Sequence, residues 1–427
     1  MSLIDWELLY QRHQGVKYDL ARIARFADEI GNPQHQYQTI HVVGTNGKGS
    51  TSSFIQRLIH NSGNRCGLYT SPHLYHPRER IRIDDELISE EYIKSWLDAH
   101  YARICHYQLS YFEIMTALAF NYFADRKCSW AVIEAGLGGR LDATNLLKPK
   151  CVVMTSISLD HQEILGETIY QIIHEKSAVI KPYCSVVVAP QPFSSEVRSI
   201  VFNKTRQQEA SFHAIAEETS IAESKSGWEG STFNLNWANC NLIQLEITLR
   251  GSWQIENAVT AVIAASLSLE DVQSLDENTV RKSLKETQWP GRLETISTDP
   301  LVIADVSHNE DGLSKTLNFI AQNRKTLPYP PAIIFSTLKR KNFTRMFEQL
   351  EQYDFPVWLY PMKTQEGLTL RELLLQAEKN STQWQIIDSI DPSVLNQFSK
   401  NSLFIIGSHY LLAEWVPLIR RRVIDSK

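Results

Sequence analysis

A lysine lies inside a glycine-rich segment that reads Gly44-Thr45-Asn46-Gly47-Lys48-Gly49-Ser50-Thr51. Glycines allow the backbone to curl so that successive N–H groups point inward at an anion. Lys48 can place a positive charge on nucleotide β- and γ-phosphates, and a helix beginning here adds the positive end of its dipole. A plain glycine-rich turn would need neither the lysine nor the hydroxyls after it. We therefore predict a phosphate-binding loop whose contacts come from Thr45, Asn46, Gly47, Lys48, Gly49 and Ser50.

The spacing of this loop departs from the general G-x-x-x-x-G-K-[ST] pattern. Only two residues separate Gly44 from Gly47, and Gly49 stands where a magnesium-binding hydroxyl usually follows the lysine. Ser50 or Thr51 can supply that hydroxyl, or the metal can take a hydroxyl from elsewhere in the chain. The loop alone leaves both arrangements open.

Glu134 follows the apolar run Trp130–Ile133, which predicts a buried strand. A carboxylate at the C-terminal edge of a parallel strand faces the ligand crevice of an open α/β sheet. Oxygen ligands of this kind suit Mg²⁺, a hard cation that also binds phosphates. The alternative is an ordinary solvated glutamate.

Lys176 falls on the apolar stripe of a predicted helix, Ile169–Ile180, because its apolar neighbours recur at spacings of three and four. Burying an ammonium group is costly unless it is paired or chemically changed. Two interpretations follow: a lysine that reaches the metal site, or one whose charged end extends to solvent.

These side chains require a scaffold, and the chain alternates short β-rich runs with amphipathic helical ones, which predicts α/β architecture. The first strands are expected at Thr39–Val43, Trp130–Ile133, Cys151–Ile157 and Val186–Ala189, with helices from Thr51, at Ile169–Ile180 and at Ile255–Leu269. Residues 214–237 are polar and predict exposed strands and loops. Later strands are expected at Leu301–Ala304, Ala332–Phe335, Val357–Tyr360, Gln385–Ile387 and Leu403–Ile406.

The segment Trp289-Pro290-Gly291-Arg292 breaks the helical pattern and marks a domain boundary. Residues 1–288 are predicted to form a doubly wound, mostly parallel sheet that carries the phosphate loop. Residues 289–427 are predicted to form a smaller Rossmann-like α/β domain, within the usual size range.

Composition narrows the class of protein. The chain has 427 residues, 43% apolar and 21% charged, which is typical of soluble globular proteins. A net charge of −5 argues against a protein that coats nucleic acid. Six cysteines without a C-x-x-C pair disfavour a zinc ribbon or disulfide scaffold and favour a reducing compartment. With no signal-like N-terminus and no apolar run long enough for a bilayer, we expect a cytoplasmic protein without nucleic-acid or membrane partners.

The GTNGKGS spelling at 44–50 resembles the Mur ligase superfamily and, within it, the folylpolyglutamate synthase and dihydrofolate synthase family. Further segments carry this resemblance in order: TSPHL at 70–74, ERI at 79–81, SYFE at 110–113, GLGGRLDATN at 136–145, DH at 160–161, EK at 175–176, Asn257, PGR at 290–292 and DVSHN at 305–309. The GLGGRLDATN stretch is very specific. The family often reads D-x-A-H-N-P where this chain has Ser307 and Glu310.

The resemblance implies a metal site with two Mg²⁺ ions. Its ligands would be Ser71, Glu134 and His161. It also implies that Lys176 is carbamylated, which turns a cation into an anion. Imidazole is an unusual magnesium ligand by softness, so the place of His161 in this set follows from the resemblance.

The resemblance also implies the substrate sites. The dihydropteroate pocket would be formed by Ser110, Phe112, Leu141, Asp142 and Ala143. ATP would further contact Asn257, Arg292 and Asp305. Asn257 could instead cap the start of a helix. L-Glutamate would be bound by His308 and Ser408, and the catalytic residues would be Lys48, Lys176 and His308.

The function implied is an ATP-dependent ligase, a monomer, that joins L-glutamate to dihydropteroate or to the glutamate tail of folates through an acyl phosphate, releasing ADP and phosphate. One alternative is a peptidoglycan-type Mur ligase, which the TSPHL and GLGGRLDATN segments disfavour. Another is a regulatory P-loop NTPase; the base-reading N-K-x-D of guanine-type switches is absent. Whether one or both synthase activities are present stays open.

Overall fold

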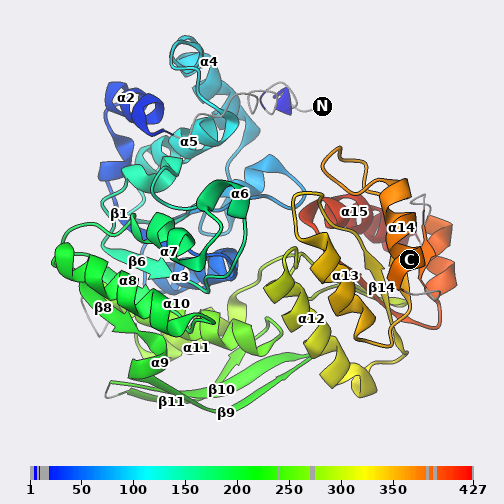
Figure 1. Ribbon diagram of the computed structural model, residues 1–427. Coiled ribbons are helices and arrows are strands. Elements are labelled where there is room, and N and C mark those ends of the chain that lie inside the picture. Colours follow the sequence, from blue (N-terminus) through cyan, green and yellow to red (C-terminus); the bar gives the residue numbers. More distant parts are fainter. Residues whose placement is uncertain are drawn as a thin grey trace. The chain divides into compact units, whose positions relative to one another are not determined.

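The computed structural model describes residues 4–6, 9, 19–238, 240–269, 275–380, 384–387 and 392–425. The chain divides into two compact units (Figure 1). The first comprises Met1–Lys225, Ser231–Thr248 and Ser252–Gln288, and the second comprises Ser226–Gly230, Leu249–Gly251 and Trp289–Lys427. Each unit is built on a largely parallel sheet with helices packed beside it, which confirms the predicted α/β fold class.

The first unit contains an eight-stranded sheet in the order β4-β3-β2-β5-β1-β6-β7-β8. Its strands are β1 (Gln38–Val43), β2 (Cys66–Tyr69), β3 (Ile81–Ile83), β4 (Glu86–Leu87), β5 (Trp130–Glu134), β6 (Cys151–Met154), β7 (Ser185–Val188) and β8 (Ser211–Ala214). The strands from β2 to β8 in that order run parallel, while β3 pairs antiparallel with β2. Because both faces of the parallel strands are covered, they read as continuous apolar runs.

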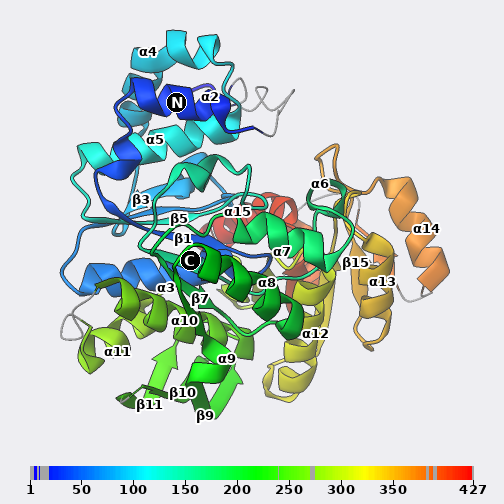
Figure 2. The same cartoon turned by 60° about the vertical axis from the view of Figure 1, so that its left-hand side comes forward.

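Helices cover both faces of this sheet. On one face α3 (Lys48–Asn61) contacts β1, β2 and β5 and packs against α10 (Ser252–Leu269) and α11 (Glu277–Glu286). On the other face α5 (Tyr111–Asp125) packs with residues of β2 and β5, and α7 (Ile169–Ser177) and α8 (Ser194–Gln207) pack with residues of β6 and β7. Figure 2 shows α5 above the strands and α3 with α10 below them. Further helices are α2 (Ala21–Glu29), α4 (Glu90–His106), α6 (Gln162–Leu165) and α9 (Ile215–Glu218).

The polar middle of the chain forms a three-stranded sheet, in line with the exposed strands expected at 214–237. Its strands are β9 (Thr219–Gly227), β10 (Gly230–Trp237) and β11 (Cys240–Ile247), in the order β11-β10-β9. The turn at its tip, residues 226–230, belongs to the second unit. There the Trp228 ring lies 4.9 Å from the ring of Phe319 and 5.6 Å from that of Phe404.

The second unit has a six-stranded sheet in the order β12-β13-β17-β14-β15-β16. Its strands are β12 (Glu294–Thr298), β13 (Leu301–Asp305), β14 (Pro331–Phe335), β15 (Val357–Leu359), β16 (Gln385–Ile386) and β17 (Ser402–Ile406). The sequence did not predict β12, the polar edge strand that pairs antiparallel with β13. The helices are α12 (Glu310–Asn323), α13 (Phe343–Glu351), α14 (Leu370–Asn380) and α15 (His409–Asp425).

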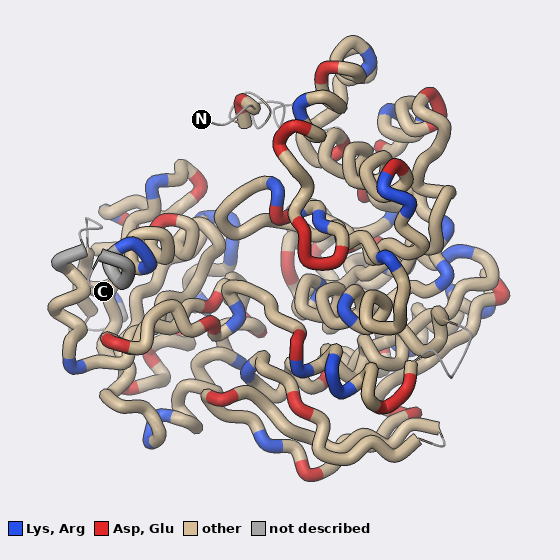
Figure 3. The backbone as a smooth tube through the Cα atoms, turned by 180° about the vertical axis from the view of Figure 1, so that it is seen from behind, with Lys and Arg blue, Asp and Glu red and all other residues tan. Residues whose placement is uncertain are grey.

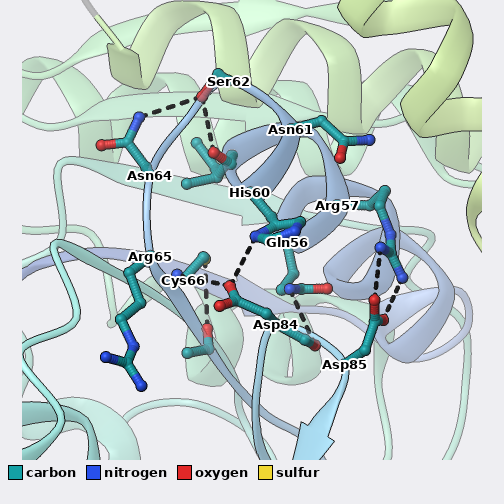
Figure 4. A network of polar contacts seen from close by, with 12 residues as sticks. Gln56, Arg57, His60, Asn61, Ser62, Asn64, Arg65, Cys66, Asp84 and Asp85 are labelled. Carbon is teal, nitrogen blue, oxygen red and sulfur yellow. Dashed lines mark hydrogen bonds and ion pairs between the residues drawn. The ribbon is translucent and has the colours of Figure 1, made fainter.

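A polar network fixes the C-terminal half of α3 to the turn between β3 and β4 (Figure 4). Arg57 forms a two-pronged ion pair with Asp85. His60 Nδ1 lies 2.9 Å from Asp84 Oδ1, and the Gln56 side chain donates to Asp84 O at 3.2 Å. Asp84 Oδ1 also accepts the N–H of Cys66, the first residue of β2. The network therefore fixes the C-terminal half of α3 near the N-terminal end of the parallel strand β2.

Charged residues of both signs are interspersed over the two units (Figure 3). No helix in the described part of the chain is both long and apolar enough to cross a membrane.

Candidate functional site

The predicted phosphate and metal residues of the first unit gather where neighbouring parallel strands end. The phosphate loop follows β1, Glu134 is the last residue of β5, and Ser71 follows β2. The register pairs Val42 with Glu134, and it pairs the neighbouring β5 residue, Ile133, with Tyr69. Carboxyl ends of adjacent parallel strands are the usual ligand crevice of open α/β sheets.

The two turn glycines of the phosphate loop are required by their surroundings. A Cβ on Gly44, at φ +152°, would lie 1.9 Å from the Thr155 hydroxyl oxygen. A Cβ on Gly47, at φ +87°, would lie 2.5 Å from Asn257 Oδ1. The chain after β6 fixes the loop from the other side, because Ser156 O accepts the N–H groups of Thr45 and Asn46 at 2.8 and 3.1 Å.

Helix α3 begins at Lys48, so the predicted start at Thr51 was late by three residues. The Thr51 N–H donates to Gly47 O at 2.9 Å. The N–H groups just before it, from Gly47 to Ser50, therefore have no acceptor within the helix. A helix N-terminus with such N–H groups is a ready anion site. Helical propensity missed this start because one glycine, Gly47, caps the helix and a second, Gly49, lies in its first turn.

The Lys48 side chain lies over the loop. Its Nζ donates to the carbonyl oxygens of Gly44 and Thr45, each at 3.3 Å, and it is 4.0 Å from Glu134 Oε1. The ammonium group is thus held between the loop and the carboxylate that ends β5. A phosphate bound at the start of α3 would meet this charge.

Asn257 reaches the same loop from α10. The prediction that it begins a helix was wrong, because α10 starts at Ser252 and Asn257 lies inside it. Its amide donates to Gln254 Oε1 at 3.0 Å, and its Oδ1 faces Gly47. The alternative role as a helix cap is thereby excluded.

Ser71 and Glu134 are in contact, since the Ser71 N–H donates to Glu134 Oε2 at 3.1 Å. The Ser71 hydroxyl is buried without a hydrogen-bond partner in the described chain, and so are the hydroxyls of Ser50 and Thr51. The Ser71 hydroxyl, buried without a partner beside the buried Glu134 carboxylate, fits a small cation that prefers oxygen ligands.

His161 lies in the segment after β6, with a left-handed backbone at φ 52°. Its imidazole is within 4.0 Å of Asp160 Oδ2 and 3.8 Å of Glu163 Oε1. Among the described residues, no group of three or more His, Cys, Asp or Glu side chains is arranged to hold a metal. The structure therefore joins Ser71 to Glu134 and gives His161 acidic neighbours of its own.

Lys176 is buried, with 4% of its surface exposed, and its Nζ donates to Gly44 O at 2.7 Å. Burial, together with the charge of Lys48, lowers the pKa of the Lys176 amine to about 7, against the smaller opposing effect of Asp160 and Asp142. The charged end therefore does not extend to solvent. Helix α7 ends at Ser177, three residues before the predicted end at Ile180.

The lowered pKa of Lys176 predicts a pH-dependent stability. Between pH about 7 and 10.5 the unfolded chain holds a proton on this amine that the folded chain lacks. The free energy of unfolding should therefore rise with pH in that window, by about 1 kcal/mol per pH unit from this group. In CO₂-free buffer, urea unfolding at pH 7, 8 and 9 should show this slope in the natural chain and lose it in Lys176→Met. The exposed Lys148→Met is the control, and equal slopes in all three proteins would contradict the prediction.

The residues predicted for dihydropteroate lie around α5 and the segment after β5. Phe112 packs on Gly136, where a Cβ would be 2.4 Å from the end of its ring, and its ring centroid is 6.2 Å from that of Tyr69. Ser110 caps α5, and its hydroxyl donates to Glu113 at 2.7 Å. Leu141 is half-buried and Ala143 is buried.

Asp142 is a buried carboxylate that several donors hold. It accepts the N–H groups of Leu137 at 2.8 Å and of Thr144 at 3.0 Å, and it also accepts the Thr144 hydroxyl. Burial raises the pKa of this carboxyl, and these hydrogen bonds oppose the rise. A buried carboxyl group held by several donors thus lies a few residues from the Gly136 contact with Phe112.

In the second unit, Asp305 ends β13 and fixes the chain that enters the unit. Its Oδ2 accepts the Leu293 N–H and its Oδ1 accepts the Ser307 N–H, both at 2.9 Å. Arg292 is half-buried and its guanidinium donates to Gly291 O at 3.2 Å. Asp305 therefore holds the backbone directly after Arg292, near the start of the main segment of the second unit.

His308 and Ser408 follow β13 and β17, which are adjacent parallel strands. His308 Nδ1 is 2.9 Å from Val306 O, and its ring lies 5.4 Å from the ring of His409. The Ser408 hydroxyl accepts the Tyr410 N–H at 3.2 Å. His409, which the sequence analysis did not consider, therefore lies beside His308.

Comparisons with protein families and with curated proteins agree on the family that this chain is similar to. The Mur ligase middle domain matches residues 42–265. The chain is 30% identical over 424 residues to the dihydrofolate synthase/folylpolyglutamate synthase of Bacillus subtilis, covering 96% of each protein. It is 32% identical over 353 residues to the folylpolyglutamate synthase of Lacticaseibacillus casei, covering 81% of each.

Solved structures have the same fold as this chain over nearly its whole length. Mycobacterium tuberculosis folylpolyglutamate synthase complexed with ADP superposes with a TM-score of 0.88 at 26% identity, covering 100% of this chain and 98% of that one. An FPGS–AMPPCP–folate complex superposes with a TM-score of 0.81 at 29% identity, covering 98% and 99%.

Proposed function

Because the chain belongs to the folylpolyglutamate synthase and dihydrofolate synthase family of Mur ligases, we propose that it joins L-glutamate to dihydropteroate or to the glutamate tail of folates, with ATP as energy source. The observation that carries this is the phosphate loop with Lys48 beside the Ser71–Glu134 pair, on a fold shared with relatives solved with ADP, AMPPCP and folate. We further propose that it acts as a cytoplasmic monomer on small molecules.

The reaction proceeds in two steps. The γ-phosphoryl group of ATP passes to the substrate carboxylate, forming an acyl phosphate and ADP. The amine of glutamate then attacks the acyl carbon, phosphate leaves and the amine loses a proton. Lys48 and the N–H groups at the start of α3 offset the negative charge that builds on the transferred group. No covalent enzyme intermediate is required.

Ser71 and Glu134 would hold Mg²⁺ through the Ser71 hydroxyl and the Glu134 carboxylate, with His161 as a further ligand of a second ion. A bound Mg²⁺ would neutralise phosphate charge beside Lys48. The binding of Mg²⁺ at this position is supported by the buried Ser71 hydroxyl and by the oxygen donors that Ser71 and Glu134 supply.

Lys176 is proposed to carry a carbamate. At neutral pH part of its amine is uncharged, because burial lowers its pKa to about 7. A neutral amine attacks CO₂, forms an N–C bond and releases a proton, which leaves a negatively charged carboxylate bonded to Nζ. That anion would replace the repulsion between Lys176 and Lys48 with an attraction.

The remaining ligands are assigned by the same relationship. Ser110, Phe112, Leu141, Asp142 and Ala143 are proposed to bind the pteridine, and Asn257, Arg292 and Asp305 the nucleotide. His308 and Ser408 are proposed to bind glutamate, with His308 also catalytic. The contact of Asn257 with Gly47 supports its place at the nucleotide.

Product analysis tests the function. The protein is incubated with ATP, L-glutamate and either dihydropteroate or tetrahydrofolate, and mass spectrometry identifies the product. We expect one added glutamate in at least one arm, with ADP and phosphate released only when glutamate is present. Nucleotide hydrolysis independent of glutamate, without ligation, would instead indicate a regulatory NTPase.

Arg292→Lys should lower kcat and raise the KM for ATP. A guanidinium binds phosphate oxygens with paired donors, which a lysine does not reproduce. Misplacing the γ-phosphate harms the transition state more than the ground state, so we expect a loss of about 10²-fold in kcat/KM. Steady-state kinetics should compare it with Arg345→Lys, a change at an exposed arginine on α13. Equal kinetics for the two variants would contradict the nucleotide role.

A further inference from the structure

A histidine lies inside the apolar sheet of the first unit. His41 is on β1, fully buried, and the register places Ile133 of β5 and Val152 of β6 on either side of it. These neighbours contribute to the apolar clusters that meet α5 and α7. A valine or isoleucine would suit this position better for stability alone, because burying a polar ring carries a desolvation cost. A polar residue at a position where an apolar residue would be more stable often has a function.

His41 is hydrogen-bonded to the segment that carries Asp142. His41 Nε2 lies 2.8 Å from the Thr144 hydroxyl oxygen, and that hydroxyl donates to Asp142 Oδ1. Thr144 is fully buried, and Asp142 is 6% exposed. The three side chains form a buried relay that joins the centre of β1 to the carboxylate.

The relay has a fixed direction. A threonine hydroxyl has one hydrogen, and here it goes to a carboxylate oxygen, so Thr144 must accept from His41. Nε2 of His41 therefore carries the hydrogen. Nδ1 is buried and has no partner in the described part of the chain. The ring stays neutral, because burial lowers its pKa to about 3.

Donation in the opposite direction, from Asp142 through Thr144 to His41, is disfavoured by the surroundings of the histidine. A protonated Asp142 could donate to Thr144, and Thr144 would then donate to Nε2. The hydrogen of His41 would have to move to Nδ1, which has no acceptor in the described chain. A buried N–H without a partner is rarer and costlier than an unused acceptor lone pair.

We propose that His41 is a positioning residue for substrate recognition: through Thr144 it orients the Asp142 carboxylate and keeps it an acceptor for a ring with adjacent N–H donors. This inference rests on the proposed function, in which Asp142 receives the aminopyrimidinone edge of the pteridine. Two adjacent N–H donors on the ligand pair with the two accepting oxygens of a carboxylate, whereas a protonated carboxylic acid uses one of its oxygens as a donor.

The test compares variants that keep or remove each hydrogen bond. His41→Leu and Thr144→Val remove a link at similar volume, while His41→Gln and Thr144→Ser retain a donor or hydroxyl. We expect each of the first pair to raise the KM for dihydropteroate and to weaken its equilibrium binding about fivefold to tenfold. The KM for ATP and kcat should stay near their original values, and His41→Gln and Thr144→Ser should recover most of the affinity.

The double variant decides whether the two residues act as one unit. His41→Leu/Thr144→Val should bind dihydropteroate no more weakly than the worse single variant, because the second change removes a link already broken. The control is His35→Leu, a change at an exposed histidine of the same unit. Multiplied effects in the double variant, or equal changes in the KM values for ATP and dihydropteroate, would overturn the inference. If His41→Leu does not fold, Thr144→Val with Thr144→Ser carries the same test.

Failure of the inference is distinguishable from failure of the proposed function by a third change. Asp142→Asn should raise the KM for dihydropteroate whether or not the relay matters. A normal KM in Asp142→Asn would remove the pteridine role of Asp142. A raised KM there, with a normal KM in both His41→Leu and Thr144→Val, would remove the relay and leave the pteridine role intact.

Discussion

Lys48→Ala is expected to lower the ligation rate by about 10³-fold, the scale of losing an electrostatic contact to a transition state. The side chain sits between two loop carbonyls and Glu134, and no other lysine lies in the glycine-rich loop. Without it, charge on the transferred phosphoryl group is met by helix N–H groups alone. ATP binding should also weaken, while the circular dichroism spectrum should not change, since the contacts of the Lys48 ammonium group are with the loop and with Glu134.

The matched control is Lys148→Ala, at an exposed lysine shortly before β6. It should keep its ligation rate under the same conditions. Turnover near the natural level in Lys48→Ala would remove the nucleotide assignment of the loop.

Lys176→Met is expected to lose most ligase activity, on the order of 10²-fold or more, by removing a charged group that lies at the phosphate loop. A methionine fills the buried volume but supplies no anion beside Lys48. Lys176→Ala leaves a small space instead, so formate or acetate should partly restore its activity. Initial rates with and without these carboxylates measure the effect.

Two comparisons separate a carbamate from a structural amine. The natural chain should lose activity in CO₂-free buffer and regain it with bicarbonate, whereas Lys94→Met, at an exposed lysine of α4, should behave like the natural chain throughout. Full activity in Lys176→Met would defeat the functional role of this residue.

The sequence pattern alone predicted those parts of the site that are formed by residues close together in the chain. The phosphate loop is one short segment. The apolar stripe of one helix placed Lys176 among buried neighbours, but the sequence left open whether its charged end was buried or extended to solvent. The alternation of strands and helices predicted the fold class for the same reason. The antiparallel strands β3 and β12 escaped notice because they are short and partly polar.

Contacts between distant segments could not be predicted. Nothing in the segment around Asn257 indicates that its amide faces Gly47, 210 positions earlier in the chain. His41 and Thr144 are likewise ordinary residues until β1 lies beside the segment after β5. Their roles depend on which strands become neighbours, and the sequence contains no local mark of that.

The second unit is not one continuous stretch of chain, and this bears on how such proteins can recombine. Trp228 and its neighbours are encoded well before Trp289, yet Trp228 packs on Phe319 and Phe404 of the later segment. An exchange of genes at a single crossover near Trp289 would bring together aromatic partners from different ancestors. Viable chimaeras between relatives should therefore take residues 226–230 and 249–251 from the same ancestor as residues 289–427.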